Sequence, residues 1–426
     1  MSVFRSVPIG AVCLLYAAAL FAAPPAPGPT LPGVVAAASA PLQAAVRGVW
    51  QNAPEVQAAQ AELDAARARA DAAARPLYNP SVSMEAENAD VNRRTVGISL
   101  PLDLSGKRRA RESQGNAELR ASEAAYALRR RDIATRWLKA WTGAALAARQ
   151  SELGRQRVTL MQRFDELAAQ RLKVGDISSP ERDIAALALG EAQVQQAALA
   201  GNEAAAKASL RAIGGNAASS PELPPGLPPM ASAIRPVATD ELPELVQARA
   251  ERDSAEAGVT VARRARVPDP VVSLTGGEVR VGRVRDQVIG LSVSVPLPVF
   301  NTGSAEVTAA RAEANAASAT LRSQRLVLDA RLIEARTRYA ASLQAAEAFR
   351  NSRAAAFEDR AALLEKIWRA GEMSTSDYLV QLKQSLDTAL SGLELESQTW
   401  QAWFDYLTAA GRLTDWIDGR TQDVSR

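Results

Sequence analysis

Residues 81–87 read Ser-Val-Ser-Met-Glu-Ala-Glu, an alternation of polar and apolar side chains that is typical of a β-strand. Val82, Met84 and Ala86 share one face of such a strand, whereas serine and glutamate side chains share the other. The segment therefore predicts a strand with one apolar face and one polar, partly acidic face.

Three further segments, within 95–102, 271–275 and 289–295, show the same alternation. Alternation over roughly ten residues per strand is typical of strands with lipid on one face and water on the other. About eight strands are the practical minimum for a closed barrel, so four strands predict that several chains share one barrel. A soluble sheet that packs its apolar face on a helix is the alternative.

Very long helical segments follow these strands. At about 1.5 Å per residue, the segments 106–173 and 303–369 would each extend roughly 100 Å, which no globular core could cover. Apolar residues at seven-residue spacing predict left-handed coiled-coil packing. They are Leu146, Leu153, Leu160 and Leu167, then Leu379, Leu386, Leu393, Trp400 and Leu407, and, with one acidic exception, Leu382, Ala389, Glu396, Trp403 and Ala410.

The sequence contains an internal duplication. Four short motifs recur in the same order, at an offset that grows from 189 residues (Pro54 to Pro243) to 196 residues (Gly175 to Gly371). Their starting positions are Ala53 and Leu242, Asn79 and Asp269, Ser99 and Ser294, and Val174 and Ala370. Each half predicts a helix, two strands, a very long helix, a tight turn and a long helix.

This pattern divides the chain into five parts: a signal peptide and Pro/Ala-rich leader (1–38), a first repeat (41–213), a linker (214–240), a second repeat (241–412) and a C-terminal tail (413–426). The linker is rich in proline, which excludes a helix or a central strand there.

The N-terminus has the pattern of a secretory signal peptide, because Arg5 precedes an apolar run at 9–23. Cleavage after Ala19 and cleavage near Ala38 both fit, and Cys13 leaves a lipid anchor open. No later stretch has the length and hydrophobicity of a transmembrane helix, so we do not expect a helical membrane protein.

Composition excludes several classes of function. Fifty basic residues nearly balance forty-seven acidic ones, and no basic stripe with interleaved aromatics favours nucleic acid as a partner. The sequence has no histidine, and its single cysteine, Cys13, lies in the signal peptide. Ser-His-Asp and Cys-His sites therefore cannot be built, nor can a zinc cluster. We expect no catalytic residues, no cofactor and no resident metal site.

Three stretches carry a family resemblance: 100–108 (LPLDLSGKR), 266–270 (RVPDP) and 291–301 (LSVSVPLPVFN). In them the chain resembles the TolC superfamily of outer-membrane efflux proteins, most of all its CzcC-like heavy-metal efflux branch. The resemblance implies a mainly α, duplicated protomer with long coiled-coil helices and four strands in a shared trimeric transmembrane β-barrel.

The resemblance also implies a function. It indicates a passive outer-membrane channel of a tripartite RND-type efflux system for heavy-metal cations, which extends into the periplasm and contacts outer-membrane lipid, a periplasmic adaptor and an inner-membrane RND pump. Drug efflux or type I secretion is the alternative within the superfamily. A periplasmic coiled-coil adaptor is the alternative of another class, but an adaptor normally carries one helical hairpin, and this chain predicts two.

The candidate site residues lie at the two helix turns and on the first strand. Two turns per chain in a trimer would give six similar ends, which suit a sixfold ring of adaptor hairpins. We expect adaptor contacts at Val174, Gly175, Ile177, Ser178, Gly371, Met373 and Ser374. Turn chemistry alone is the alternative for the glycines. Acidic rings that favour cations at the aperture or in the lumen are expected from Asp176, Glu372, Asp377, Glu85 and Glu87.

Overall fold

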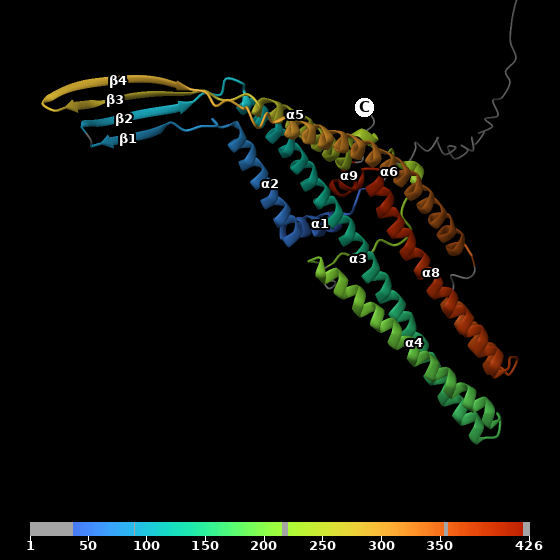
Figure 1. Ribbon diagram of the computed structural model, residues 1–426. Coiled ribbons are helices and arrows are strands. Elements are labelled where there is room, and N and C mark those ends of the chain that lie inside the picture. The colour runs from blue at the N-terminus through green and yellow to red at the C-terminus, as the bar shows by residue number, and fades with distance from the viewer. Residues whose placement is uncertain (1–36, 89, 215–219, 353–356, 421–426) are drawn as a thin grey trace, which may run out of the picture. The chain divides into compact units, whose positions relative to one another are not determined.

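The computed structural model describes residues 37–88, 90–214, 220–352 and 357–420 (Figure 1). The expected signal peptide and leader lie outside the described residues, apart from their last two positions. Of these, Ala38 is buried, and its N–H donates to the carbonyl of Trp416 (3.1 Å).

The elements follow the predicted order in both repeats. The first repeat contains α1 (Ala40–Asn52), α2 (Pro54–Ala74), β1 (Ser81–Glu87), β2 (Val91–Pro101), α3 (Lys107–Lys173) and α4 (Ser179–Ala212). The second contains α5 (Pro243–Ala265), β3 (Val271–Val281), β4 (Val284–Ser294), α6 (Ser304–Arg350), α7 (Phe357–Arg369) and α8 (Thr375–Ala409), and α9 (Leu413–Asp418) follows it. Short 3-10 helices η1 (Ala231–Ala233) and η2 (Thr239–Glu241) lie in the linker. A mainly α fold with four strands is confirmed.

Two helices differ from the prediction. The expected first helix is split at Ala53, because Pro54 cannot continue the hydrogen-bonded ladder but suits the first turn of a new helix, α2. The expected second long helix ends as α6 at Arg350, whereas its counterpart α3 runs unbroken for 67 residues. None of the helices in the described part of the chain combines the length and hydrophobicity that a membrane span requires.

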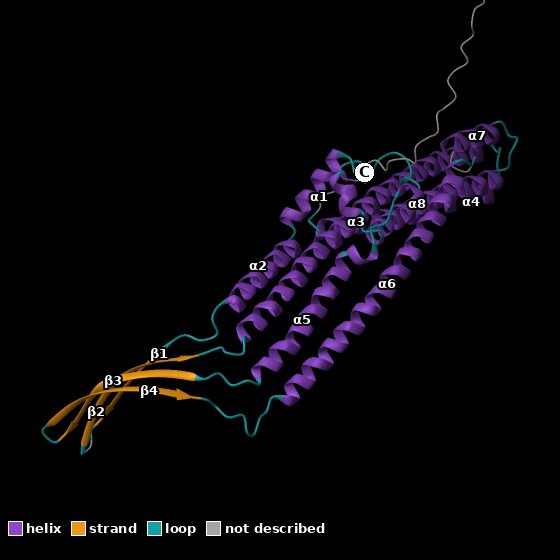
Figure 2. Cartoon of the chain, turned by 90° about the horizontal axis from the view of Figure 1, so that it is seen from above, coloured by secondary structure: helices purple, strands orange, loops and turns teal. Residues whose placement is uncertain are grey.

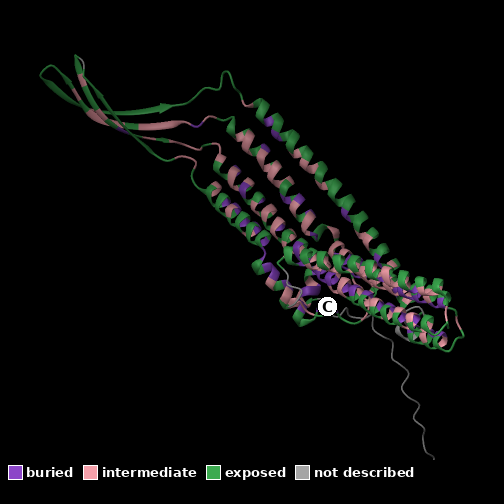
Figure 3. Cartoon of the chain, turned by 90° about the horizontal axis from the view of Figure 1, so that it is seen from below, coloured by how far each residue is buried: buried purple, intermediate pink, exposed green. Residues whose placement is uncertain are grey.

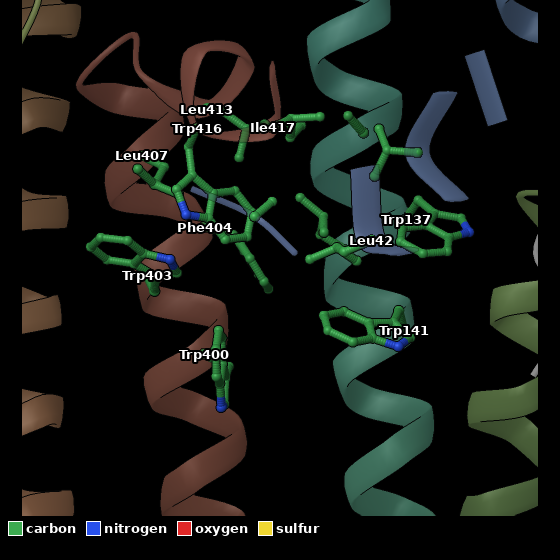
Figure 4. Packing of buried hydrophobic residues seen from close by; sticks show 14 of the residues in the cluster. Leu42, Trp137, Trp141, Trp400, Trp403, Phe404, Leu407, Leu413, Trp416 and Ile417 are labelled. Carbon is green, nitrogen blue, oxygen red and sulfur yellow. The ribbon is translucent and has the colours of Figure 1, made fainter. Parts of the chain in front are cut away.

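The largest core lies where α1, α3, α6, α8 and α9 meet (Figure 4). Trp137 and Trp403 are completely enclosed, and the Tyr339 ring lies 5.0 Å from the Trp403 ring. Leu413 and Ile417 of α9 are also buried here. The stretch that we expect as a C-terminal tail therefore begins with a helix that belongs to this core.

Aromatic side chains tie the Pro-rich linker to the same core. Three helices, α3, α6 and α8, each supply a donor to a linker carbonyl. The bonds run from Trp141 Nε1 to Pro221 (2.8 Å), from the Tyr339 hydroxyl to Pro229, and from the Tyr406 hydroxyl to Ala231 (3.2 Å). Burial raises the pKa of both tyrosines, so the hydroxyls stay protonated as donors.

The strands form one antiparallel sheet in the order β1-β2-β3-β4, beyond the ends of α2, α3, α5 and α6 (Figure 2). Directly opposed residues share a face, so the register defines two faces across all four strands. The apolar face carries Val82, Met84, Val96, Ile98, Leu100, Val272, Leu274, Ile289, Leu291 and Val293. The polar face carries Ser81, Ser83, Glu85, Glu87, Thr95, Ser99, Ser273, Thr275 and Ser292, and toward the turns it also carries Val91, Val279, Val281, Val284 and Val288. The predicted alternation is confirmed, and most of the sheet is exposed (Figure 3).

Candidate functional site: the helix tips and the strand faces

The first tip joins α3 to α4 through a left-handed glycine. Gly175 has a φ of 76°, its N–H donates to the carbonyl of Leu172 (3.0 Å), and the N–H of Asp176 donates to that of Arg171 (2.9 Å). A β-carbon at Gly175 would meet no atom within 4 Å, so backbone conformation alone requires glycine here. Ser178 is the N-cap of α4, and its backbone N–H donates to the Glu181 carboxylate (2.8 Å).

The second tip repeats this geometry between α7 and α8. Gly371 also has a φ of 76°, and its N–H donates to the carbonyl of Trp368 (3.0 Å), while the N–H of Glu372 donates to that of Ile367 (3.2 Å). Ser374 caps α8 by accepting the N–H of Asp377 (3.0 Å). Both predicted turns are thus built in the same way.

An aromatic cluster packs beneath the two tips. The Phe164 ring of α3 lies 4.6 Å from the Trp368 ring of α7 and 5.1 Å from the Tyr378 ring of α8. Trp368 donates its indole N–H to the Thr375 hydroxyl (3.3 Å). Burial raises the pKa of Tyr378 to about 12, which keeps its phenol neutral. The cluster makes the two hairpins one packed body at this end.

Arg171 connects the two tips directly. Its guanidinium carbon lies 4.6 Å from the centre of the Trp368 ring, and Nη2 donates to the carbonyl of Arg369 (3.5 Å). The same side chain pairs with Asp176 (3.6 Å). Sequence reasoning missed Arg171, because no local pattern indicates that it reaches a residue of the other repeat.

The structure divides the expected adaptor contacts into two groups. Val174, with 79% of its surface exposed, and both glycines and serines lie on the exterior. Ile177 and Met373 instead turn inward and pack against the aromatic cluster. The two serines also cap α4 and α8. Val174 is therefore the exposed contact candidate whose side chain makes no hydrogen bond within the tip.

The acidic residues at the tips are exposed, and they do not share a common partner. Asp176 pairs with Arg171, Asp377 accepts a hydrogen bond from the Ser374 hydroxyl (2.7 Å), and Glu372 is exposed. Within the described residues, no group of three or more Asp, Glu, His or Cys side chains could hold a metal ion. These carboxylates can act on a passing cation through their field rather than as a ligand set.

Glu85 and Glu87 share the polar face, as expected. The register places Glu85 opposite Thr95 and Glu87 opposite Arg93. Asp286 lies in the same row as Arg93, two strands away. Three acidic residues and one arginine give this end of the polar face a formal charge of −2.

A buried charge joins the repeats where helices meet strands. Asp269, 8% exposed, pairs with Lys107 Nζ (2.8 Å) and accepts a hydrogen bond from the Tyr78 hydroxyl. Nearby, Asp103 accepts the backbone N–H of Lys107 (2.8 Å) and so caps α3. Asp269 and Lys107 lie in two of the stretches that carry the family resemblance, but their pairing was not predicted.

Comparison with known proteins agrees with this geometry. The family model "Outer membrane efflux protein" matches residues 46–216 and 236–412, which correspond to the two repeats. The cobalt-zinc-cadmium resistance protein CzcC of Cupriavidus metallidurans is 25% identical over 77% of this chain and 80% of its own length. The nickel-cobalt-cadmium resistance protein NccC of Alcaligenes xylosoxydans xylosoxydans is 26% identical over 70% of each chain.

Solved structures share the fold. The outer-membrane channel CmeC of Campylobacter jejuni superimposes with a TM-score of 0.74 at 15% identity, over 90% of this chain and 89% of that one. Repeated helical hairpins, a four-stranded exposed sheet and the family match together lead to one conclusion. The chain belongs to the outer membrane efflux protein family, whose place is the outer membrane, with extension into the periplasm.

Proposed function

We propose that this chain is one protomer of a homotrimeric outer-membrane duct that exports heavy-metal cations passively, without a catalytic role. The observation that carries this proposal is the four-stranded sheet, whose apolar face is exposed over all four strands. Nine of the ten apolar side chains on this face are exposed. Exposing them to water is unfavourable, and contact with lipid removes that cost. Three copies would bring twelve strands together, which is enough to close a barrel.

The cargo is inferred from the relatives. CzcC and NccC are named for resistance to cobalt, zinc, nickel and cadmium. The chain has no histidine, so imidazole ligands are not available, and selection of the ion would fall to the pump. Acidic side chains on the polar face and at the tips would favour cations in transit. Drug export or type I secretion is the competing cargo assignment.

Two experiments test the duct and its cargo. The protein should be recovered with outer membranes and run as a heat-modifiable oligomer, and recovery in the soluble periplasmic fraction would favour the adaptor alternative. Deleting the gene should sensitise cells to cobalt, zinc or cadmium, with restoration by the intact gene. Sensitivity to organic drugs alone would indicate that the duct exports drugs rather than metal cations.

We further propose that the two tips contact a periplasmic adaptor that links the duct to an RND pump. Both tips present the same Schellman-type turn, so three chains would present six similar ends. Val174→Arg places a bulky charge on the exterior without removing a cap, and it should abolish export while the trimer stays intact. Ser178 and Ser374 are poorer test positions, because losing a cap costs about 1 kcal/mol. Normal export by Val174→Arg would contradict the proposal that the exposed surface of the tip contacts the adaptor.

A further inference from the structure

We propose that the apolar face of the sheet ends in a binding site for the phosphate groups of anionic membrane lipid, formed by Arg94 and Arg280. This inference rests on the proposed membrane insertion and names a specific lipid partner for it. The site lies at the end of the sheet away from the helices, next to the Gly282–Arg283 turn between β3 and β4.

The strand register places both arginines on the apolar face. Arg94 stands opposite Glu278 and follows Val96 and Ile98 along the same side of β2. Arg280 follows Leu274 on the same side of β3, two rows beyond Gly276. Both arginine side chains are exposed. On the apolar face, the aliphatic row of Val96 is therefore followed by the row of Arg94 and then by the row of Arg280.

Most of this charge is left uncompensated. Glu278 pairs with Arg285 (3.1 Å), the third arginine on this face. Among the described residues, neither Arg94 nor Arg280 has a carboxylate within ion-pair distance. Three arginines against one glutamate give this end of the apolar face a formal charge of +2, opposite in sign to the polar face behind it.

The spacing suits a membrane boundary. On β4 the apolar face carries exposed Ile289, Leu291 and Val293, which span roughly 14 Å at about 3.4 Å per residue. With barrel strands tilted by about 40°, this length corresponds to about 11 Å of depth, which is part of the roughly 25 Å apolar band of outer-membrane barrels. Beyond the strand, on the side of the helices, exposed Val295 and Leu297 continue the apolar stretch. At the other end, Arg94 follows in the next row and Arg280 in the row after it, where lipid phosphates would lie.

Guanidinium chemistry fits that ligand. Arginine presents a planar fork of donors that binds phosphate oxygens with two parallel hydrogen bonds. A solvated face would equally tolerate charge, but it would not require that the two faces of the sheet carry charge of opposite sign at this end, with the positive charge on the face that continues the aliphatic rows. Charge complementarity and continuity with the apolar face therefore favour lipid phosphate over water.

The experiment compares lipid retention between matched variants. The full-length protein is placed in bilayers of zwitterionic lipid containing a small fraction of bisphosphorylated lipid A, and co-purifying lipid A is quantified. Arg94→Gln with Arg280→Gln should lower the enrichment about 25-fold, since each arginine near an anionic surface contributes about fivefold, or ~1 kcal/mol. Arg93→Gln is the matched control, because Arg93 is the adjacent residue but lies on the polar face.

A variant of opposite sign completes the test. Glu278→Gln frees Arg285 from its partner and should raise lipid A enrichment. Equal enrichment in all variants, loss in Arg93→Gln as large as in the double variant, or displacement of lipid A by inorganic phosphate would overturn the site. Insertion into purely zwitterionic bilayers is measured in parallel. Failure to insert would count against the duct, whereas insertion without lipid A preference counts only against this site.

Discussion

Arg171 covers the ring of Trp368 at 4.6 Å, so a side chain of the first hairpin rests on an aromatic residue of the second. The two residues come from different repeats, and the contact is made one turn before each left-handed glycine. The two tips of one chain are therefore mechanically coupled, although they belong to different helical hairpins.

Replacing Arg171 by alanine should loosen the second tip. A cation–π contact at a partly exposed site contributes about 0.5–1 kcal/mol, so amide exchange at Gly371 and Glu372 should accelerate about two- to fivefold. Arg171→Lys keeps the positive charge and should show a smaller effect, and Lys173→Ala, at an exposed neighbour, should show none. Unchanged exchange in Arg171→Ala would mean that the aromatic cluster alone holds the tips together.

Two glycines with open surroundings should respond to alanine in opposite directions. Gly175 has a positive φ, so Gly175→Ala should cost about 1–2 kcal/mol. Gly190 lies inside α4, again with no atom within 4 Å of an added β-carbon, so Gly190→Ala should stabilise by up to about 1 kcal/mol. Thermal unfolding followed by circular dichroism checks both. Destabilisation of equal size at both positions would contradict the backbone explanation.

Removing one partner of the ion pair between Asp269 and Lys107 should lower the free energy of unfolding more than replacing both partners by apolar residues. Asp269→Leu leaves a largely buried ammonium without its partner and should destabilise by about 3 kcal/mol. Adding Lys107→Met should recover a substantial part of that loss, which a double-mutant cycle on the unfolding midpoint measures. Strictly additive losses would show that the two groups do not stabilise each other.

Glu396 should make stability depend on pH. Burial raises its pKa, against the opposing effect of Arg149 (3.4 Å) and Arg350, so the folded state binds more protons than the unfolded state above the ordinary glutamate pKa. The contribution of Glu396 to the free energy of unfolding is therefore full at pH below the ordinary glutamate pKa. It is lost as the pH rises through the pKa that Glu396 has in the folded state. Glu396→Gln should raise the melting temperature at neutral pH and have little effect at pH 4. The same increase at both pH values would exclude titration of Glu396 as the cause.

Local patterns in the sequence predicted the strands and the turns, because alternation and the Gly-x-x-Ser spacing act within a few residues. The break at Pro54 was equally visible in the sequence, whereas nothing near Arg350 indicates that α6 ends there. The contact of Arg171 with Trp368 depends on how two hairpins of different repeats pack, which no local pattern specifies. The position of Arg93 opposite Glu87, by contrast, could have been found by counting residues across the hairpin.

This position of Arg93 changes what is expected of the two acidic residues on β1. Glu85 faces a neutral threonine, whereas the field of Glu87 is offset by Arg93 directly across the ladder. Within a Debye length of about 8 Å the two opposite charges nearly cancel for a passing ion. Glu85→Gln should therefore lower the cation preference of the pore more than Glu87→Gln does, and Arg93→Gln should raise it. Reversal potentials of single channels in planar bilayers under a salt gradient measure all three, with oligomer assembly as the control. Identical selectivity in every variant would show that the polar face is merely solvated and does not line the conducting path, whereas a larger effect of Glu87→Gln than of Glu85→Gln would show that Arg93 does not shield it.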